Sequence, residues 1–203
     1  MISHGGFQLD DAHHAIIFDC DGTLADSMPA HFQAWSKTFA DHGIPFSEER
    51  FYSLGGMPSD KIIAMMSEEH GKPMHPGEVS REKEENFLAF LGDLRPVAKV
   101  VALAREQKGR RKLAVASGGF RWVIDRQLEH IGLADWFDTI VTAEDTERHK
   151  PEPDVFLEAA HRLGVEPAAC LVLEDADLGV EAARRAGMQV VDVRLNGWGS
   201  SSV

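Results

Sequence analysis

The stretch Phe18-Asp19-Cys20-Asp21-Gly22-Thr23 decides which fold is predicted for this chain. It continues the apolar run Ala15-Ile16-Ile17, and a short apolar run of this kind is typical of a buried β-strand. Two aspartates, spaced i and i+2, therefore stand where the strand ends, and the glycine after them permits a tight turn. Carboxylates in such a loop can act as a nucleophile, bind a metal ion and exchange a proton. The loop is the first candidate for a catalytic site.

Composition limits the classes of protein to consider. The chain has 203 residues, enough for one packed domain with a modest insertion. Its formal net charge is −12 and its longest basic run is Arg110-Arg111-Lys112, so we expect neither nucleic acid nor a membrane as a partner. No apolar stretch is as long as a membrane span, and the first residues lack the pattern of a signal peptide. Cys20 and Cys170 lie in or beside apolar segments and are expected to be reduced core residues. We predict a cytoplasmic protein, and a monomer because no sustained heptad pattern is present.

Strand and helix patterns alternate along most of the chain. Beyond the first strand, apolar runs predict strands at 113–116, 139–141, 170–173 and 189–193. Helix patterns lie between them, at 97–108, 120–131, 154–163 and 178–186. This alternation predicts an α/β fold with a doubly wound, Rossmann-like parallel sheet.

One long segment interrupts the alternation. The stretch 27–94 contains helix patterns and no strand pattern; Phe32, Trp35 and Phe39, for example, share one helical face. We therefore predict a core domain formed by 1–26 and 95–203, with 27–94 inserted as a small helical cap domain.

Side chains that can do chemistry follow four of the predicted strands. They are Asp19 and Asp21 after the first strand, Ser117 after the second, Lys150 beyond the third, and Glu174 and Asp175 after the fourth. Each has an ordinary alternative taken alone: a turn, a helix cap or a solvated surface cation. Because the carboxyl ends of parallel strands share one crevice, their joint occurrence predicts a single site.

Longer motifs around these residues resemble those of the haloacid dehalogenase superfamily. The motifs are Phe-Asp-x-Asp-Gly-Thr-Leu-x-Asp-Ser at 18–27, His-Lys-Pro-Glu-Pro-Asp at 149–154, and the stretch 171–187. Within that superfamily the chain is similar to small sugar-phosphate phosphatases and β-phosphoglucomutases that carry a helical cap. The resemblance implies a phosphoric monoester hydrolase that acts on a small sugar phosphate, of the fructose 1-phosphate or 6-phosphogluconate type.

A phosphate monoester is dianionic, so its charge must be neutralised before a carboxylate can attack it. Mg²⁺ is the cofactor we expect, because this hard ion takes oxygen ligands and keeps several waters. The resemblance implies that Asp19, Asp175 and the backbone carbonyl of Asp21 bind it. Glu174 is expected to bind it directly or through water.

The remaining roles concern the phosphoryl group and its leaving oxygen. Asp19 is expected to form an aspartyl-phosphate, and Asp21 to act first as the acid and then as the base. A proton donor at Asp21 favours phosphoryl transfer over dehalogenation, which expels a halide. Ser117, Lys150 and the backbone N–H of Gly118 are expected to bind phosphoryl oxygens.

The choice between phosphatase and mutase rests on the cap. The β-phosphoglucomutases of this subgroup place an arginine in the segment that matches 55–59, and this chain has none there. His31 and Lys83 match polar cap positions and are predicted to bind substrate. The run Arg81–Glu85 equally fits a solvated helical face. We therefore predict a phosphatase, with a phosphomutase and a non-catalytic binding or regulatory protein as alternatives.

Overall fold

The computed structural model describes residues 2–4, 7–55, 57–195 and 197–198. The chain divides into two compact units. Unit 1 comprises Met1–Asp26 and Arg95–Val203, and unit 2 comprises Ser27–Leu94. Within the described ranges, no helix has the combination of length and apolar character that spanning a membrane requires.

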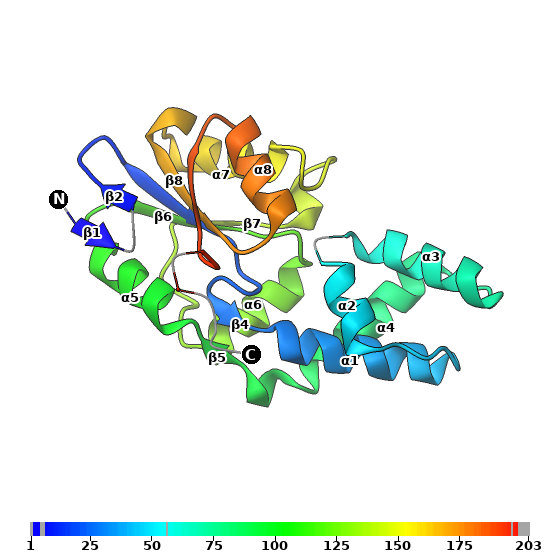
Figure 1. The fold of residues 1–203 in the computed structure, drawn as a ribbon. Coiled ribbons are helices and arrows are strands. Elements are labelled where there is room, and N and C mark those ends of the chain that lie inside the picture. Colours follow the sequence, from blue (N-terminus) through cyan, green and yellow to red (C-terminus); the bar gives the residue numbers. More distant parts are fainter. Residues whose placement is uncertain (1, 5–6, 56, 196, 199–203) are drawn as a thin grey trace. The chain divides into compact units, whose positions relative to one another are not determined.

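Unit 1 is built on a sheet of five parallel strands in the order β7-β6-β3-β8-β9 (Figure 1). The strands are β3 (Ala15–Phe18), β6 (Lys112–Ala116), β7 (Thr139–Val141), β8 (Cys170–Glu174) and β9 (Gln189–Asp192). Strand β3 is central, and its residue Phe18 pairs with Val115 of β6 and Leu173 of β8. This register brings the residues after β3, β6 and β8 to one edge of the sheet.

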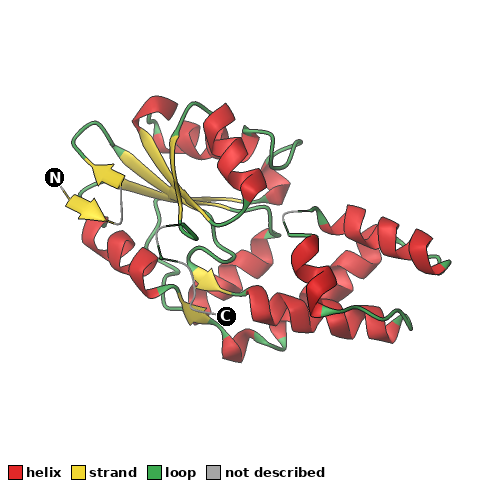
Figure 2. Ribbon diagram, in the orientation of Figure 1, coloured by secondary structure: helices red, strands yellow, loops and turns green. Residues whose placement is uncertain are grey.

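Helices cover both faces of the sheet (Figure 2). They are α5 (Ala98–Gln107), α6 (Arg121–His130), α7 (Asp154–Leu163) and α8 (Asp177–Arg185). Side chains of β3 alternate between two cores: Ile16 and Phe18 pack with α5 and α6, whereas Ile17 packs with α7 and α8. The predicted doubly wound parallel sheet is confirmed, since it is buried from both sides.

Two short antiparallel ribbons were not predicted from the sequence. Strands β1 (Ile2–His4) and β2 (Phe7–Leu9) form the first, and β4 (Ala25–Asp26) pairs with β5 (Arg95–Pro96) in the second. Strands of two or three residues are too short to show an alternating pattern. The second ribbon joins the two segments of unit 1 where the chain enters and leaves unit 2.

Unit 2 is helical and has its own core. Its elements are α1 (Met28–Asp41), α2 (Glu48–Ser53), α3 (Ser59–His70), α4 (Pro76–Leu88) and the 3₁₀ turn η1 (Leu91–Asp93). Trp35, Phe39 and Ile63 are among the side chains that form this core. Aromatic residues of α1 stack directly, with the rings of Trp35 and Phe39 centred 5.1 Å apart.

The substitution Leu173→Ala tests how much the packing of the central strands stabilises unit 1. Its side chain is fully buried in β8, whereas that of Leu195 is 83% exposed. Leu173→Ala should reduce the free energy of unfolding by about 2–5 kcal/mol, because it removes buried methyl groups and leaves a cavity. Leu195→Ala, the matched control, should change it by about 0.5 kcal/mol or less. Urea unfolding followed by circular dichroism measures both, and equal effects would contradict the assigned core.

Candidate active site

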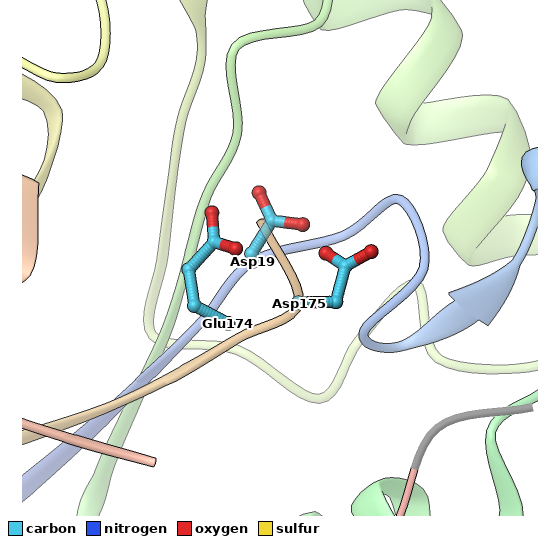
Figure 3. Close-up of side chains that lie close together, drawn as sticks. All are labelled: Asp19, Glu174 and Asp175. Atoms are coloured by element: carbon cyan, nitrogen blue, oxygen red, sulfur yellow. The ribbon is translucent and has the colours of Figure 1, made fainter. Parts of the chain in front are cut away.

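Three carboxylates gather at the carboxyl edge of the sheet (Figure 3). Asp19 follows β3, Glu174 ends β8, and Asp175 comes next. One oxygen of each lies within 4.8 Å of one oxygen of each other carboxylate. Pairing between β3 and β8 explains the convergence, because the backbone N–H of Asp19 donates to the carbonyl of Leu173 at 3.0 Å.

Lys150 supplies the positive charge of this cluster. Its ammonium donates to Oδ1 of Asp19 and to Oε1 of Glu174, both at 2.7 Å, and to the carbonyl of Ala116 at 3.4 Å. Burial disfavours the charged ammonium, but Asp19 and Glu174 outweigh that effect and raise the pKa of Lys150. Lys150 therefore stays protonated and joins two strand ends through charge-assisted hydrogen bonds.

Glu174 is held by hydrogen bonds at both oxygens. Oε1 accepts from Lys150, and Oε2 accepts from the backbone N–H of Ala176 at 2.6 Å. Gly179 makes room for it, because a Cβ at that position would overlap the Glu174 carboxyl group. Glu174 thus orients Lys150, and a cation would have to share an oxygen that already accepts a hydrogen bond.

Asp175 is positioned by the loop that follows β3. The Thr23 hydroxyl donates to Oδ1 of Asp175 at 3.2 Å. Gly22 has φ +77°, and a Cβ at this residue would collide with the Asp175 carboxyl group. Glycine at position 22 therefore permits the turn and leaves room for the Asp175 carboxyl group.

The cluster has more negative charge than Lys150 can balance. Burial raises the pKa of Asp19 well above its usual value; Lys150 lowers it, and Glu174 and Asp175 raise it further. Burial, followed by repulsion from Glu174, raises the pKa of Asp175 to about 7. Both carboxylates would bind protons readily unless another cation came close to them.

This donor set fits a hard divalent cation. Within the described part of the chain, Oδ2 of Asp19 and Oδ2 of Asp175 accept no hydrogen bond. Figure 3 shows an oxygen of Asp19 and an oxygen of Asp175 facing each other. A hard divalent cation such as Mg²⁺ prefers oxygen ligands, and these carboxylates offer only oxygen. Its charge would also offset the repulsion that raises their pKa values.

Asp21 has a different environment from the three clustered carboxylates. The side-chain amide of Gln127 in α6 donates to its Oδ1 at 2.9 Å. Its carboxylate is not part of the group that could hold a metal ion. The backbone carbonyl of Asp21 stays a predicted ligand, because no contact of the described residues tests it.

Ser117 and Gly118 follow β6 at the same edge of the sheet. The Ser117 side chain is buried, its backbone N–H donates to Val141 at 3.0 Å, and its Oγ accepts from the backbone N–H of Gly119 at 3.0 Å. Gly118 is exposed in the turn that follows. The helix-cap alternative for Ser117 is wrong, because Phe120 occupies the N-cap position of α6 and the Ser117 hydroxyl bonds within the preceding turn. Both remain predicted phosphoryl ligands.

His31 and Lys83 contact each other within unit 2. The Lys83 ammonium lies 2.9 Å from Nδ1 of His31 and donates to Oε1 of Glu84 at 2.9 Å. Lys83 and Glu84 are only 4% and 6% exposed. The alternative of a solvated charged face is wrong for these two residues and holds for Arg81 and Glu85, which form an exposed ion pair at 3.1 Å.

Comparison with known proteins places this site in a family. The family model for haloacid dehalogenase-like hydrolases matches residues 16–193. The chain belongs to this family. The predicted resemblance is confirmed, and the match includes β3, β6 and β8 with the residues at their ends.

Relatives of this hydrolase include sugar-phosphate enzymes. It is 37% identical over 185 residues to the fructose-1-phosphate phosphatase YqaB of Escherichia coli (strain K12), which covers 91% of this chain and 98% of that protein. It is 29% identical over 188 residues to the beta-phosphoglucomutase of Bacillus subtilis (strain 168), covering 88% and 82% of the two chains. The crystal structure of CbbY from Rhodobacter sphaeroides in complex with phosphate superposes with a TM-score of 0.80 at 28% identity, covering 88% and 84%. The predicted class of enzyme, a phosphatase, is confirmed.

Gly179 provides a test of how the hydrolase positions Glu174. Gly→Ala within a helix usually stabilises a protein by about 1 kcal/mol. Gly179→Ala should instead destabilise this one by about 1–3 kcal/mol, because the added methyl group displaces a carboxylate that is buried and hydrogen-bonded. Gly77 of α4 is the matched control, since no neighbouring atom lies within 4 Å of a Cβ there. Denaturant unfolding of both variants measures the difference, and a gain in stability from both would refute the assigned contact.

Proposed function

We propose that this hydrolase releases inorganic phosphate from a small sugar phosphate in a Mg²⁺-dependent reaction. The observation that carries the proposal is the Lys150 ammonium, which bonds Asp19 and Glu174 at 2.7 Å while Asp175 lies beside them. A fixed cation next to a carboxylate nucleophile is what the transfer of a dianionic group requires. The similarity to relatives named as phosphatases supports the same reaction.

The two oxygens of Asp19 can take different parts in this reaction. Oδ1 is held by Lys150, and among the described residues Oδ2 accepts no hydrogen bond. One oxygen forms a bond to phosphorus while the bond from phosphorus to the sugar oxygen breaks, which gives an aspartyl-phosphate. Lys150 remains close to the phosphoryl oxygens and stabilises their charge. Ser117 and the backbone N–H of Gly118 are the proposed additional donors.

Asp21 is proposed to transfer the proton in both steps of the reaction. Its carboxyl group donates a proton to the sugar oxygen as that oxygen leaves, and its carboxylate then takes one from the water that attacks the aspartyl-phosphate. Atoms balance over the two steps: the sugar leaves with one proton, and water supplies the oxygen of the released phosphate. The hydrogen bond from Gln127 holds one oxygen of Asp21 in place at 2.9 Å.

Asp19, Asp175 and the backbone carbonyl of Asp21 are the proposed Mg²⁺ ligands. When bound, the ion neutralises phosphoryl charge and offsets the repulsion between the carboxylates. Glu174 is proposed to bind the ion directly or through water. Both of its oxygens already accept a hydrogen bond, so a direct bond would use an oxygen shared with a donor.

The substrate proposed is a monophosphorylated sugar or sugar acid, with fructose 1-phosphate and 6-phosphogluconate as the first candidates. Unit 2 is proposed to act as the cap domain, with His31 and Lys83 as substrate ligands. Glu84 compensates the charge of Lys83 within the buried cluster. A balanced cluster favours neutral hydroxyl groups over a second phosphate, and this supports a phosphatase.

A phosphomutase is the second candidate, because the chain is similar to a protein named beta-phosphoglucomutase. Incubation with β-glucose 1-phosphate separates the two: a phosphatase releases phosphate, whereas a mutase yields glucose 6-phosphate without it.

The buried free cysteines accord with the predicted cytoplasmic location. Location and the predicted monomer stay predictions.

Asp19→Asn tests the nucleophile. It should reduce phosphate release from fructose 1-phosphate at least about 1,000-fold, because an amide cannot form the acyl phosphate. Folding should be retained, since the amide oxygen can still accept from Lys150. Asp125→Asn removes an exposed carboxylate of α6 and should leave the rate within about twofold. A colorimetric phosphate assay, with circular dichroism as the check on folding, decides; near-normal turnover by Asp19→Asn would remove this residue from its role.

Thermal unfolding tests the metal site independently of activity. Mg²⁺ at 100 times its dissociation constant should stabilise the protein by about 2.7 kcal/mol and raise Tm by about 5–11 °C. Asp175→Asn should raise Tm in the presence of a chelator, because it relieves repulsion, and should abolish the increase with Mg²⁺. Glu129→Gln, an exposed control, should respond as the unaltered protein does. An undiminished Mg²⁺ response of Asp175→Asn would contradict the assignment of this ligand.

A further inference from the structure

A fully buried glutamine lies on the apolar face of α6. The buried residues of this helix are Val123, Ile124, Gln127 and Leu128, and Gln127 has no exposed surface. Its backbone carbonyl is already used, because it accepts from the N–H of Ile131 at 3.0 Å. An apolar side chain would suit this position on the helix, so the amide needs a separate explanation.

The two ends of the Gln127 amide differ in their contacts. Nε2 donates to Oδ1 of Asp21 at 2.9 Å, across 106 residues of sequence. Oε1 is buried and has no hydrogen-bond partner within the described chain. A buried acceptor without a partner is destabilising. Gln127 therefore does not have the contacts of a residue present for stability alone.

The loop around Asp21 explains what the amide can add. Backbone hydrogen bonds close this loop: the N–H groups of Leu24 and Ala25 donate to the carbonyl of Cys20 at 2.9 and 3.0 Å, and that of Gly22 donates to the carbonyl of Ala25 at 2.8 Å. They fix the backbone, whereas the orientation of the Asp21 carboxyl group depends on contacts of the side chain itself. The hydrogen bond from Gln127 is one such contact, and because an amide is uncharged it adds no positive charge beside the carboxylate.

We propose that Gln127 is a positioning residue that holds the Asp21 carboxyl group for proton exchange with the leaving oxygen. This inference rests on the proposed function, because it assigns Gln127 to the proton-transfer step of that reaction. Correct placement of an acid matters most where the leaving group is a strong base. A sugar alkoxide needs a proton as it leaves, whereas 4-nitrophenolate leaves readily without one.

The test compares two substrates in Gln127→Met. Methionine has a similar length and suits a buried apolar face, so Tm should be unchanged or higher as the unpartnered Oε1 disappears. For the faster of fructose 1-phosphate and 6-phosphogluconate, kcat/KM should fall about tenfold; for 4-nitrophenyl phosphate it should change less than threefold. In an Asp21→Asn background the same substitution should have no further effect on the sugar phosphate.

Gln107 provides a matched control. It is also a fully buried glutamine of unit 1, its Nε2 has no partner in the described chain, and its Oε1 accepts from Arg111 instead. Gln107→Met should leave the ratio of the two kcat/KM values unchanged.

An unchanged ratio of the two kcat/KM values in Gln127→Met would overturn the inference, whether both values fall equally or neither falls. Failure of both Gln127→Met and Gln127→Leu to fold would also overturn it, because the amide would then be structural. Absence of phosphate release from any substrate by the unaltered enzyme would instead refute the proposed function, so the two failures are distinguishable.

Discussion

The burial of carboxylates at the end of the central strands is the constraint on which the rest of the site depends. Asp19 and Glu174 are 6% and 1% exposed, and carboxylates withdrawn from water to that extent need a partner charge. Lys150 meets this need with one ammonium group shared between two strand ends. Lys150 donates no hydrogen bond to Asp175, and a further cation beside this carboxyl group would offset the repulsion from Glu174.

Much of unit 1 could be predicted because it depends on local pattern. Strands such as 139–141 and helices such as 154–163 match the structure at both ends, and the others differ by one or two residues. Parallel pairing then dictates that Asp19, Ser117 and Glu174 share an edge. The ribbon of β4 and β5 escaped prediction, because two residues carry no periodicity and their pairing depends on segments about 70 residues apart.

The supporting residues of the site could not be predicted because their roles arise only from tertiary contacts. Gln127 looks like an ordinary polar residue in a helix, and only the fold directs its amide to Asp21. Gly179 occupies a helical stretch with no local reason for glycine, and the Glu174 carboxylate supplies that reason. For Lys83 the sequence was misleading. Its charged neighbours suggest a solvated helical face, but packing against the rings of Trp35 and Phe87 buries its side chain.

The two units differ in how their buried charges are balanced. In unit 2, one ammonium meets one carboxylate, and Nδ1 of His31 accepts from the same ammonium. In unit 1, three carboxylates surround one ammonium. With its three carboxylates ionised, the cluster of unit 1 has net negative charge, which a dianionic phosphate alone would increase and a divalent cation alone would offset. When the phosphate and the divalent cation bind together, they add no net charge to the site. Charge balance therefore favours the metal–ester pair over the free ester in unit 1, while the buried charges of unit 2 already balance each other.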